Sequence, residues 1–215
     1  MATRLRIGID FDNTIITYDD VFRAAAKSRG LIVADFAGSK QAVRDAIRLL
    51  PDGELAWQRL QGQVYGKGIA GAKMVAGVDA FLRRAKAEGA TVVVVSHKTE
   101  YGHFDPDRVN LRAAALDWMT GQGLFDRGIA LPNVYFESTR AEKLERIAAL
   151  SLTHFIDDLE EVLIDPGFPP DVARILFADE APPASGPYVW CPTWGAIERQ
   201  VFGGAAPGTG PGIGS

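Results

Sequence analysis

Short apolar runs alternate with amphipathic segments along most of the chain, a pattern that indicates alternating strands and helices. Residues 91–95 are almost all valine and predict a strand buried on both faces of a sheet. Shorter apolar runs predict further strands at residues 5–9, 134–136, 153–156 and 174–177, the last of these being the final strand. Residues 77–88 predict an amphipathic helix ending at Gly89, with an apolar face made of Val78, Phe81, Leu82 and Ala85.

Residues that commonly cap helices mark where the other helices begin. We expect these beginnings at Asp19 or Asp20, Ser39, about Glu54, Asp105-Pro106, Thr139 and Thr193. Thr139 gives the most specific of these signals, because Glu142 follows at the spacing of a capping box. That capping box places Lys143 in the first turn of its helix.

The order of these elements predicts an α/β fold. Strands and helices alternate from residue 73 onward, which favours a mainly parallel sheet with helices on both faces. Residues 17–72 carry only helical patterns and predict an inserted helical subdomain. We therefore expect a core made of residues 1–16 and 73–202. Residues 203–215 are a Gly/Pro-rich tail that cannot bury a core.

Composition narrows the functional classes. The 215 residues carry a formal charge of −4, which gives no reason to expect nucleic acid or an anionic membrane as a partner. Cys191 is the single cysteine, so the chain forms no internal disulfide. The first residues before Asp10 include no long apolar segment of the kind found in signal peptides or membrane spans, so we expect a cytoplasmic protein.

Polar side chains follow three of the predicted strands. Asp10 and Asp12 come directly after the first strand, Ser96 follows the valine-rich strand, and Asp157 with Asp158 follows the strand at 153–156. Ligands of doubly wound sheets bind at the carboxyl ends of the strands, so these side chains and Lys143 can converge on one edge. Two carboxylates as close as Asp10 and Asp12 repel each other unless a cation or a shared proton relieves them.

The chemistry available to this set is narrow. Oxygen ligands without paired His or Cys suit a hard cation such as Mg²⁺. A carboxylate can act as a nucleophile and form an aspartyl-phosphate, while a second carboxyl protonates the leaving oxygen and later activates water. A cation, an ammonium and a hydroxyl would neutralise charge on a phosphoryl group in transfer.

The order Asp-x-Asp-x-Thr, Ser after an apolar strand, Lys, and Ile-Asp-Asp resembles the haloacid dehalogenase superfamily in its phosphatase branch. The resemblance covers about residues 5–180. It departs from the usual pattern where His97 and Lys98, rather than a small polar residue, follow Ser96. The resemblance implies a Rossmann-like core, and it implies that the helical insertion at 17–72 is a C1-type cap.

The resemblance also implies a role for each matching residue. Asp10 would be the nucleophile and a Mg²⁺ ligand, and Asp12 the general acid and base with its backbone carbonyl on the metal. Ser96 and Lys143 would bind the phosphoryl oxygens. Asp157 would bind Mg²⁺ directly or through water, and Asp158 would support that shell or Lys143. The expected activity is hydrolysis of a small soluble phosphorylated metabolite, with a sugar phosphate or a nucleotide favoured.

Several alternatives stay open at the level of sequence. His97 and Lys98 either contact substrate or belong to a polar loop beside the site. Asp157 and Asp158 also suit the N-cap of a following helix. For function, the alternatives are a phosphomutase, a dehalogenase, which needs the first aspartate and no metal, and a phosphate-binding regulatory protein without activity. The sequence carries no signal for the oligomeric state.

Overall fold

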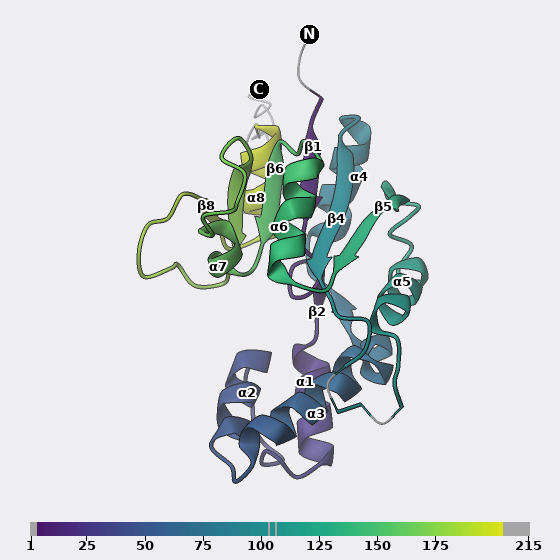
Figure 1. Cartoon of the computed structure of the whole chain (residues 1–215), viewed down its shortest axis with the longest axis vertical. Coiled ribbons are helices and arrows are strands. Elements are labelled where there is room, and N and C mark those ends of the chain that lie inside the picture. Colours follow the sequence, from purple (N-terminus) through teal and green to yellow (C-terminus); the bar gives the residue numbers. More distant parts are fainter. Residues whose placement is uncertain (1–3, 103, 106, 204–215) are drawn as a thin grey trace, which may run out of the picture.

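The computed structural model describes residues 4–102, 104–105 and 107–203, and these are organised around a six-stranded parallel sheet (Figure 1). The strands, in their order across the sheet, are β5 (Ile129–Glu137), β4 (Thr91–His97), β1 (Arg6–Ile9), β6 (His154–Asp157), β7 (Ala173–Phe177) and β8 (Val189–Cys191). The predicted α/β fold is therefore confirmed. Strand β1 lies between β4 and β6, although these three strands are far apart in the sequence.

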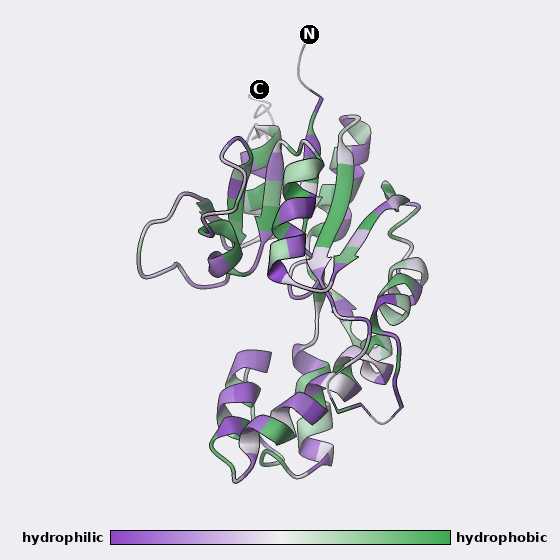
Figure 2. Cartoon of the chain, in the orientation of Figure 1, coloured by the Kyte–Doolittle hydropathy of each residue, from purple (hydrophilic) through white to green (hydrophobic). Residues whose placement is uncertain are grey.

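Helices cover both faces of the sheet. Val92 and Val94 of β4 belong to one apolar cluster, and Val93 and Val95 belong to the other, because alternate residues of a strand point to opposite faces. The first cluster is completed by α4 (Val78–Ala87), α5 (Leu111–Gly121) and α8 (Trp194–Phe202), and the second by α6 (Arg140–Ala149) and α7 (Glu160–Leu163). Figure 2 shows the strands as the most hydrophobic part of the core.

The segment at residues 17–72 lies beyond the carboxyl ends of the central strands (Figure 1). It consists of α1 (Asp19–Ser28), α2 (Lys40–Arg48), α3 (Gly53–Tyr65) and the 3₁₀ helix η1 (Lys67–Gly71). An antiparallel pair of short strands, β2 (Ile16–Thr17) and β3 (Lys73–Met74), connects it to the core. We call residues 17–72 the cap segment. Its helices pack on one another through buried side chains such as Phe22, Ile47 and Trp57.

One predicted helix start, at Asp105-Pro106, is wrong, and so is the predicted cap of α1, although that helix begins at Asp19 as expected. Helix α5 begins at Leu111, where the side chain of Asn110 accepts hydrogen bonds from two backbone N–H groups of the first turn. Asp105 instead accepts from the backbone N–H groups of Asp107 and Val109 within a turn, and Pro106 lies outside the described residues. At α1 the N-cap is Tyr18, and neither predicted aspartate caps the helix. Asp19 accepts a 2.7 Å hydrogen bond from the backbone N–H of Lys40, which joins α1 to the start of α2.

Two other expectations concern the end of the chain. Strand β7 is not the last strand, because β8 pairs with its outer edge in a three-residue register. The run at 189–191 is too short for its apolar pattern to stand out in the sequence. Of the predicted tail, residues 204–215 lie outside the described residues. In the part of the chain that the structure describes, no helix is both long enough and apolar enough to cross a membrane.

Trp194 supports the loop that follows β1. Its side chain is 1% exposed, packs edge-on against Phe81, and donates a 3.1 Å hydrogen bond from Nε1 to the backbone carbonyl of Thr14. We expect Trp194→Ala to lower the free energy of unfolding by about 3–5 kcal/mol in a urea titration. Trp190, on the edge strand β8, is 37% exposed and serves as the control. Equal losses for the two alanine variants would contradict this account of the core.

Candidate active site

Three neighbouring strands bring the predicted polar residues to one edge of the sheet. Asp10 follows β1, and its backbone N–H donates a 2.9 Å hydrogen bond to Ile156 of β6. Asp157 is the last residue of β6, and Ser96 lies in β4 on the other side of β1. All three are buried. The parallel strands thus place Asp10 and Asp157 at the same edge of the sheet, although the two residues are more than 140 positions apart in the sequence.

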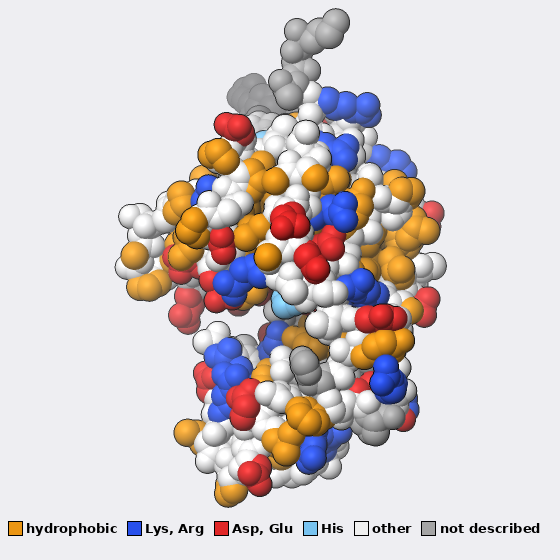
Figure 3. Space-filling view, in the orientation of Figure 1, with side chains coloured by type: hydrophobic (Ala, Val, Ile, Leu, Met, Phe, Trp, Pro, Cys, Tyr) orange, Lys and Arg blue, Asp and Glu red, His pale blue; other side chains and the backbone are white. Residues whose placement is uncertain are grey.

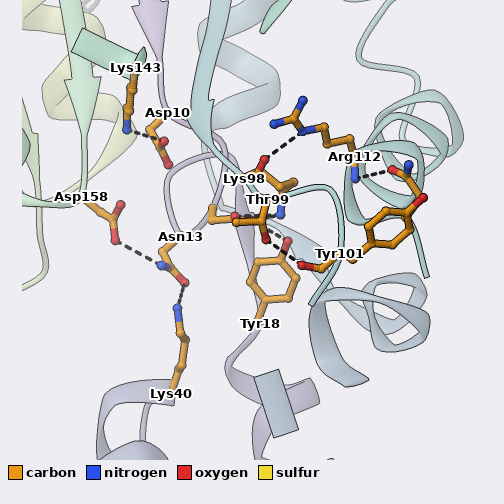
Figure 4. Close-up of polar contacts among 12 residues, drawn as sticks. Asp10, Asn13, Tyr18, Lys40, Lys98, Thr99, Tyr101, Arg112, Lys143 and Asp158 are labelled. Carbon is orange, nitrogen blue, oxygen red and sulfur yellow. Dashed lines mark hydrogen bonds and ion pairs between the residues drawn. The ribbon is translucent and has the colours of Figure 1, made fainter. Parts of the chain in front are cut away.

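Lys143 connects two of these carboxylates. Its Nζ donates to Asp10 Oδ1 at 2.7 Å and to Asp157 Oδ2 at 2.6 Å, and the side chain is almost fully buried (Figure 4 shows the contact with Asp10). The capping box of Thr139 and Glu142 forms as predicted and sets the start of α6, from which Lys143 extends. Burial alone would lower the pKa of Lys143, but Asp10 and Asp157 outweigh burial and raise it, so the ammonium stays charged.

Asp10, Asp157 and Asp158 form an acidic cluster. One carboxylate oxygen from each lies within 4.8 Å of the others. Burial raises the pKa of Asp10, the Lys143 ammonium opposes that rise, and Asp157 and Asp12 add to it. Burial also raises the pKa of Asp158, with Asp157 and Asp10 adding to the rise. A cluster made only of oxygen donors, with more negative charge than one lysine neutralises, has the chemistry that a hard divalent cation needs.

Asn13 fixes the third member of this cluster. Its φ of 60° places it in the left-handed region, which asparagine tolerates better than most residues. The turn directs Asn13 Nδ2 to Asp158 Oδ2 at 3.2 Å, and Thr14 Oγ1 contacts Asp158 Oδ1 at 3.4 Å. Asp158 does not cap the following helix, because α7 has Leu159 at its N-cap and no side-chain capping bond. Asp157 accepts the backbone N–H of Leu159 at 3.0 Å instead.

Asp12 has a separate environment. Its carboxylate lies outside the acidic cluster and contacts Lys98 Nζ at 2.8 and 3.1 Å. The Tyr18 hydroxyl donates to Asp12 Oδ1 at 2.6 Å, and burial together with Asp12 raises the pKa of Tyr18, so this hydroxyl keeps its proton. Lys98 is 4% exposed and lies over the ring of Tyr65. The expected contact between the Asp12 backbone carbonyl and a metal stays a prediction.

His97 and Ser96 point in different directions because they alternate along β4. Ser96 is buried, whereas His97 is exposed and its Nε2 lies 3.0 Å from the backbone carbonyl of Ser138. Both residues line the same cavity. Their assignment as substrate-binding residues stays a prediction.

The cavity has a volume of about 410 Å³ and lies between the edge of the sheet and the cap segment. Asp10, Asp12, Ser96, Lys143 and Asp158 line its core side. The cap segment contributes Lys40, Gln58, Gln61, Gly62 and Tyr65. Figure 3 shows the surface hollowed at this junction, with cationic side chains near the opening. The arrangement places the carboxylates of Asp10 and Asp12, which have different partners, in one partly enclosed cavity.

Lys40 and Tyr18 were not assigned to the site from the sequence, and Lys98 was left open between a substrate contact and a loop residue. Lys98 carries a weak signal, because it lies two residues beyond Ser96 and therefore on the same side of an extended chain. Lys40 and Tyr18 carry none, since the packing of the cap segment on the core brings them to the site.

Comparison with known proteins places the fold. No family model matches the sequence, and no curated protein matches it. Among solved structures, Mycobacterium tuberculosis Protein Tyrosine Kinase A is 14% identical with a TM-score of 0.60, covering 94% of this chain and 100% of its own. The putative HAD-hydrolase YfnB from Bacillus subtilis, bound to magnesium, is 10% identical with a TM-score of 0.56, covering 93% and 99%.

A predicted phosphoglycolate phosphatase from Haemophilus somnus is 15% identical with a TM-score of 0.55, covering 93% of this chain and 99% of its own. Several further matches of this kind are haloacid dehalogenase-like hydrolases, and each spans nearly the whole chain. The six-stranded parallel sheet with its flanking helices is therefore an α/β fold like that of the haloacid dehalogenase-like hydrolases.

Proposed function

We propose that this protein is a Mg²⁺-dependent phosphomonoester hydrolase that acts through an aspartyl-phosphate on Asp10. The observation that carries the proposal is the separation of two carboxylates into different environments. Asp10 lies in the acidic cluster beside Lys143, whereas Asp12 is held outside it by Lys98 and Tyr18. Two carboxylates with distinct partners suit a nucleophile and a proton carrier. The fold alone does not choose a reaction, since it also occurs in a protein described as a tyrosine kinase.

The proposed reaction has two steps. A carboxylate oxygen of Asp10 attacks phosphorus, the bond from phosphorus to the leaving oxygen breaks, and Asp12 gives that oxygen a proton. Asp12 then takes a proton from water, the water oxygen attacks phosphorus, and the bond to Asp10 breaks. Inorganic phosphate leaves and the Asp10 carboxylate is restored. The Ser96 hydroxyl and the Lys143 ammonium bind the phosphoryl oxygens in both steps.

Asp10, Asp157 and Asp158 would hold the metal, for which Mg²⁺ fits the all-oxygen donor set. A bound Mg²⁺ would neutralise charge on the transferring phosphoryl group. Lys98 and Tyr18 act as positioning residues, because they touch Asp12 and set the direction of its carboxylate. A cavity of about 410 Å³ suits a small soluble phosphorylated metabolite, and we propose a sugar phosphate or a nucleotide as the broad class.

Release of inorganic phosphate from a panel of phosphomonoesters tests this proposal. We expect phosphate release with Mg²⁺, at least 10²-fold less after treatment with EDTA, and recovery when Mg²⁺ is added back. The expectation follows from the acidic cluster, whose carboxylates need a cation before they admit an anionic phosphoryl group. Calorimetric titration of Mg²⁺ into the EDTA-treated protein and into Asp158→Asn gives a readout that does not depend on turnover.

The same assays distinguish the alternatives. A dehalogenase would release halide from a haloacid and keep its activity in EDTA. A phosphomutase would yield an isomerised substrate rather than free phosphate. A regulatory phosphate-binding protein would release phosphate from no member of the panel, and that result would contradict the proposal.

A further inference from the structure

Four side chains with fixed positive charge line the cavity, namely Lys40, Lys98, Arg140 and Lys143. Three of them are neutralised by carboxylates. Lys98 pairs with Asp12 and Lys143 with Asp10 and Asp157, while Arg140 pairs with Glu161. Within the part of the chain that the structure describes, Lys40 forms no ion pair. Lys40 is therefore the one of these four cations that has no carboxylate at ion-pair distance among the described residues.

Lys40 is held in place by the cap segment. It is the first residue of α2, Ser39 caps that helix, and the backbone N–H of Lys40 is bound to Asp19. Its Nζ crosses to the core and donates to Asn13 Oδ1 at 3.3 Å (Figure 4). The ammonium also lies 5.3 Å from the ring centre of Tyr65 and 5.6 Å from that of Phe22. These contacts fix its position without neutralising its charge.

The ammonium of Lys40 stays charged in this environment. Burial alone would lower its pKa, but Tyr65, Asp12 and Asp158 outweigh burial and raise the pKa above its ordinary value. Both of these carboxylates have other hydrogen-bond partners. Asp12 contacts Lys98 and Tyr18, and Asp158 contacts Asn13 and Thr14. Lys40 is partly buried, and its side-chain partners are the neutral amide of Asn13 and the neutral hydroxyl of Tyr65. A cation with only neutral partners at hydrogen-bond distance favours an added anion.

The remaining cap-side lining agrees with an anion at this place. The cap segment contributes Gln58, Gln61, Gly62 and Tyr65 beside Lys40, and none of these is acidic. The carboxylates that line the cavity, Asp10, Asp12, Asp158 and Glu161, all belong to the core. The core side therefore suits the metal and the transferring phosphoryl group, and the cap side suits a negatively charged part of the leaving group.

We propose that the substrate is a phosphomonoester whose leaving group carries a second anionic group, a carboxylate or a second phosphate, and that Lys40 binds this second anion. This inference rests on the proposed function and narrows its substrate class. It makes Lys40 a specificity-determining residue. It also favours phosphorylated sugar acids, hydroxy acids and sugar bisphosphates over neutral sugar phosphates and over nucleosides that carry one phosphate.

Three substrates with the same short alkyl chain test the proposal. One carries a carboxylate opposite its phosphate, one carries a second phosphate, and one ends in a neutral hydroxyl. We expect the wild type to prefer at least one anionic substrate by about 10-fold or more in kcat/KM. In Lys40→Met the loss on the preferred anionic substrate should exceed the loss on the neutral one by about 10- to 100-fold, mainly through KM.

Two further variants make the result specific to charge at this position. Lys40→Arg keeps the charge and should restore most of the preference for the anionic substrate. Lys67→Met is the matched control, because Lys67 belongs to the same cap segment, is 66% exposed, pairs with Asp107 and does not line this cavity. It should behave as the wild type.

The outcomes separate this inference from the proposed function. If the wild type hydrolyses all three substrates equally well, or if Lys40→Met loses the same factor on each, the second-anion site is wrong while the phosphatase proposal stands. Preference for the carboxylate or for the second phosphate identifies the source of the anion. If the wild type releases phosphate neither from these three substrates nor from any member of the wider panel, the proposed function fails and this inference fails with it.

Discussion

Asp10→Asn is expected to abolish phosphate release, by a factor on the order of 10⁴ or more in kcat. The variant keeps the shape of the side chain but removes the oxygen nucleophile, and it leaves Lys143 with Asp157 as its one carboxylate partner. The measurement is steady-state phosphate release with Mg²⁺ on the best substrate of the panel. Far-ultraviolet circular dichroism and a urea titration show whether the variant is folded.

Asp45→Asn is the matched control for this experiment. Asp45 lies in α2, is exposed, and pairs with Arg44 away from the cavity. Its replacement should change kcat by less than about twofold, as expected for an exposed pair of this kind. If a folded Asp10→Asn keeps more than about a hundredth of the wild-type rate, Asp10 is not the nucleophile.

Asp12→Asn is expected to show a loss that depends on the leaving group. On an alkyl phosphate, kcat/KM should fall by about 10²–10⁴, because an alkoxide needs a proton as it leaves. On para-nitrophenyl phosphate the loss in kcat/KM should be far smaller, because a nitrophenolate leaves without one. The ratio kcat/KM reports the first phosphoryl transfer, so the comparison isolates the acid role of Asp12.

Lys98→Met and Tyr18→Phe extend this prediction to the residues that hold Asp12. Each removes one contact to the Asp12 carboxylate and leaves the carboxylate itself in place. Both should therefore show the same dependence on the leaving group as Asp12→Asn, at a smaller amplitude. Losses that are equal for alkyl and aryl phosphates would assign Asp12, Lys98 and Tyr18 a structural role instead.

Much of the fold follows from patterns that operate locally. The valine run at 91–95 forms the predicted buried strand, and Thr139 forms the predicted capping box. Both could be predicted because they depend on residues that are close in the sequence. The convergence of Asp10, Ser96 and Asp157 could also be foreseen, since parallel strands share one carboxyl edge. These features required no knowledge of how distant side chains pack.

The partners of Asp12 and the position of Lys40 depend on packing across the junction of core and cap segment. The sequence left open whether Lys98 contacts substrate or belongs to a polar loop. In the structure the rings of Phe11 and Tyr65 enclose its side chain and direct it to Asp12. Tyr18 is the N-cap residue of α1, and its hydroxyl reaches Asp12 through the packing of α1 against the core. Helix α5 begins later than predicted, because Asn110 caps its first backbone N–H groups, whereas Asp105 accepts its hydrogen bonds within the preceding turn.

The location of the phosphoryl group during turnover shows whether Asp10 forms the proposed aspartyl-phosphate. Asp12→Asn is mixed with para-nitrophenyl phosphate and Mg²⁺, quenched in acid and digested, and its peptides are weighed by mass spectrometry. With this substrate the aspartyl-phosphate forms without an acid, but its hydrolysis still needs Asp12. The aspartyl-phosphate should therefore accumulate in Asp12→Asn, and we predict one phosphoryl group per chain on the peptide that contains Asp10. The opposite result is release of phosphate while the Asp10 peptide carries no phosphoryl group at any quench time. If both this variant and the wild type gave that result, Asp10 would not form the intermediate.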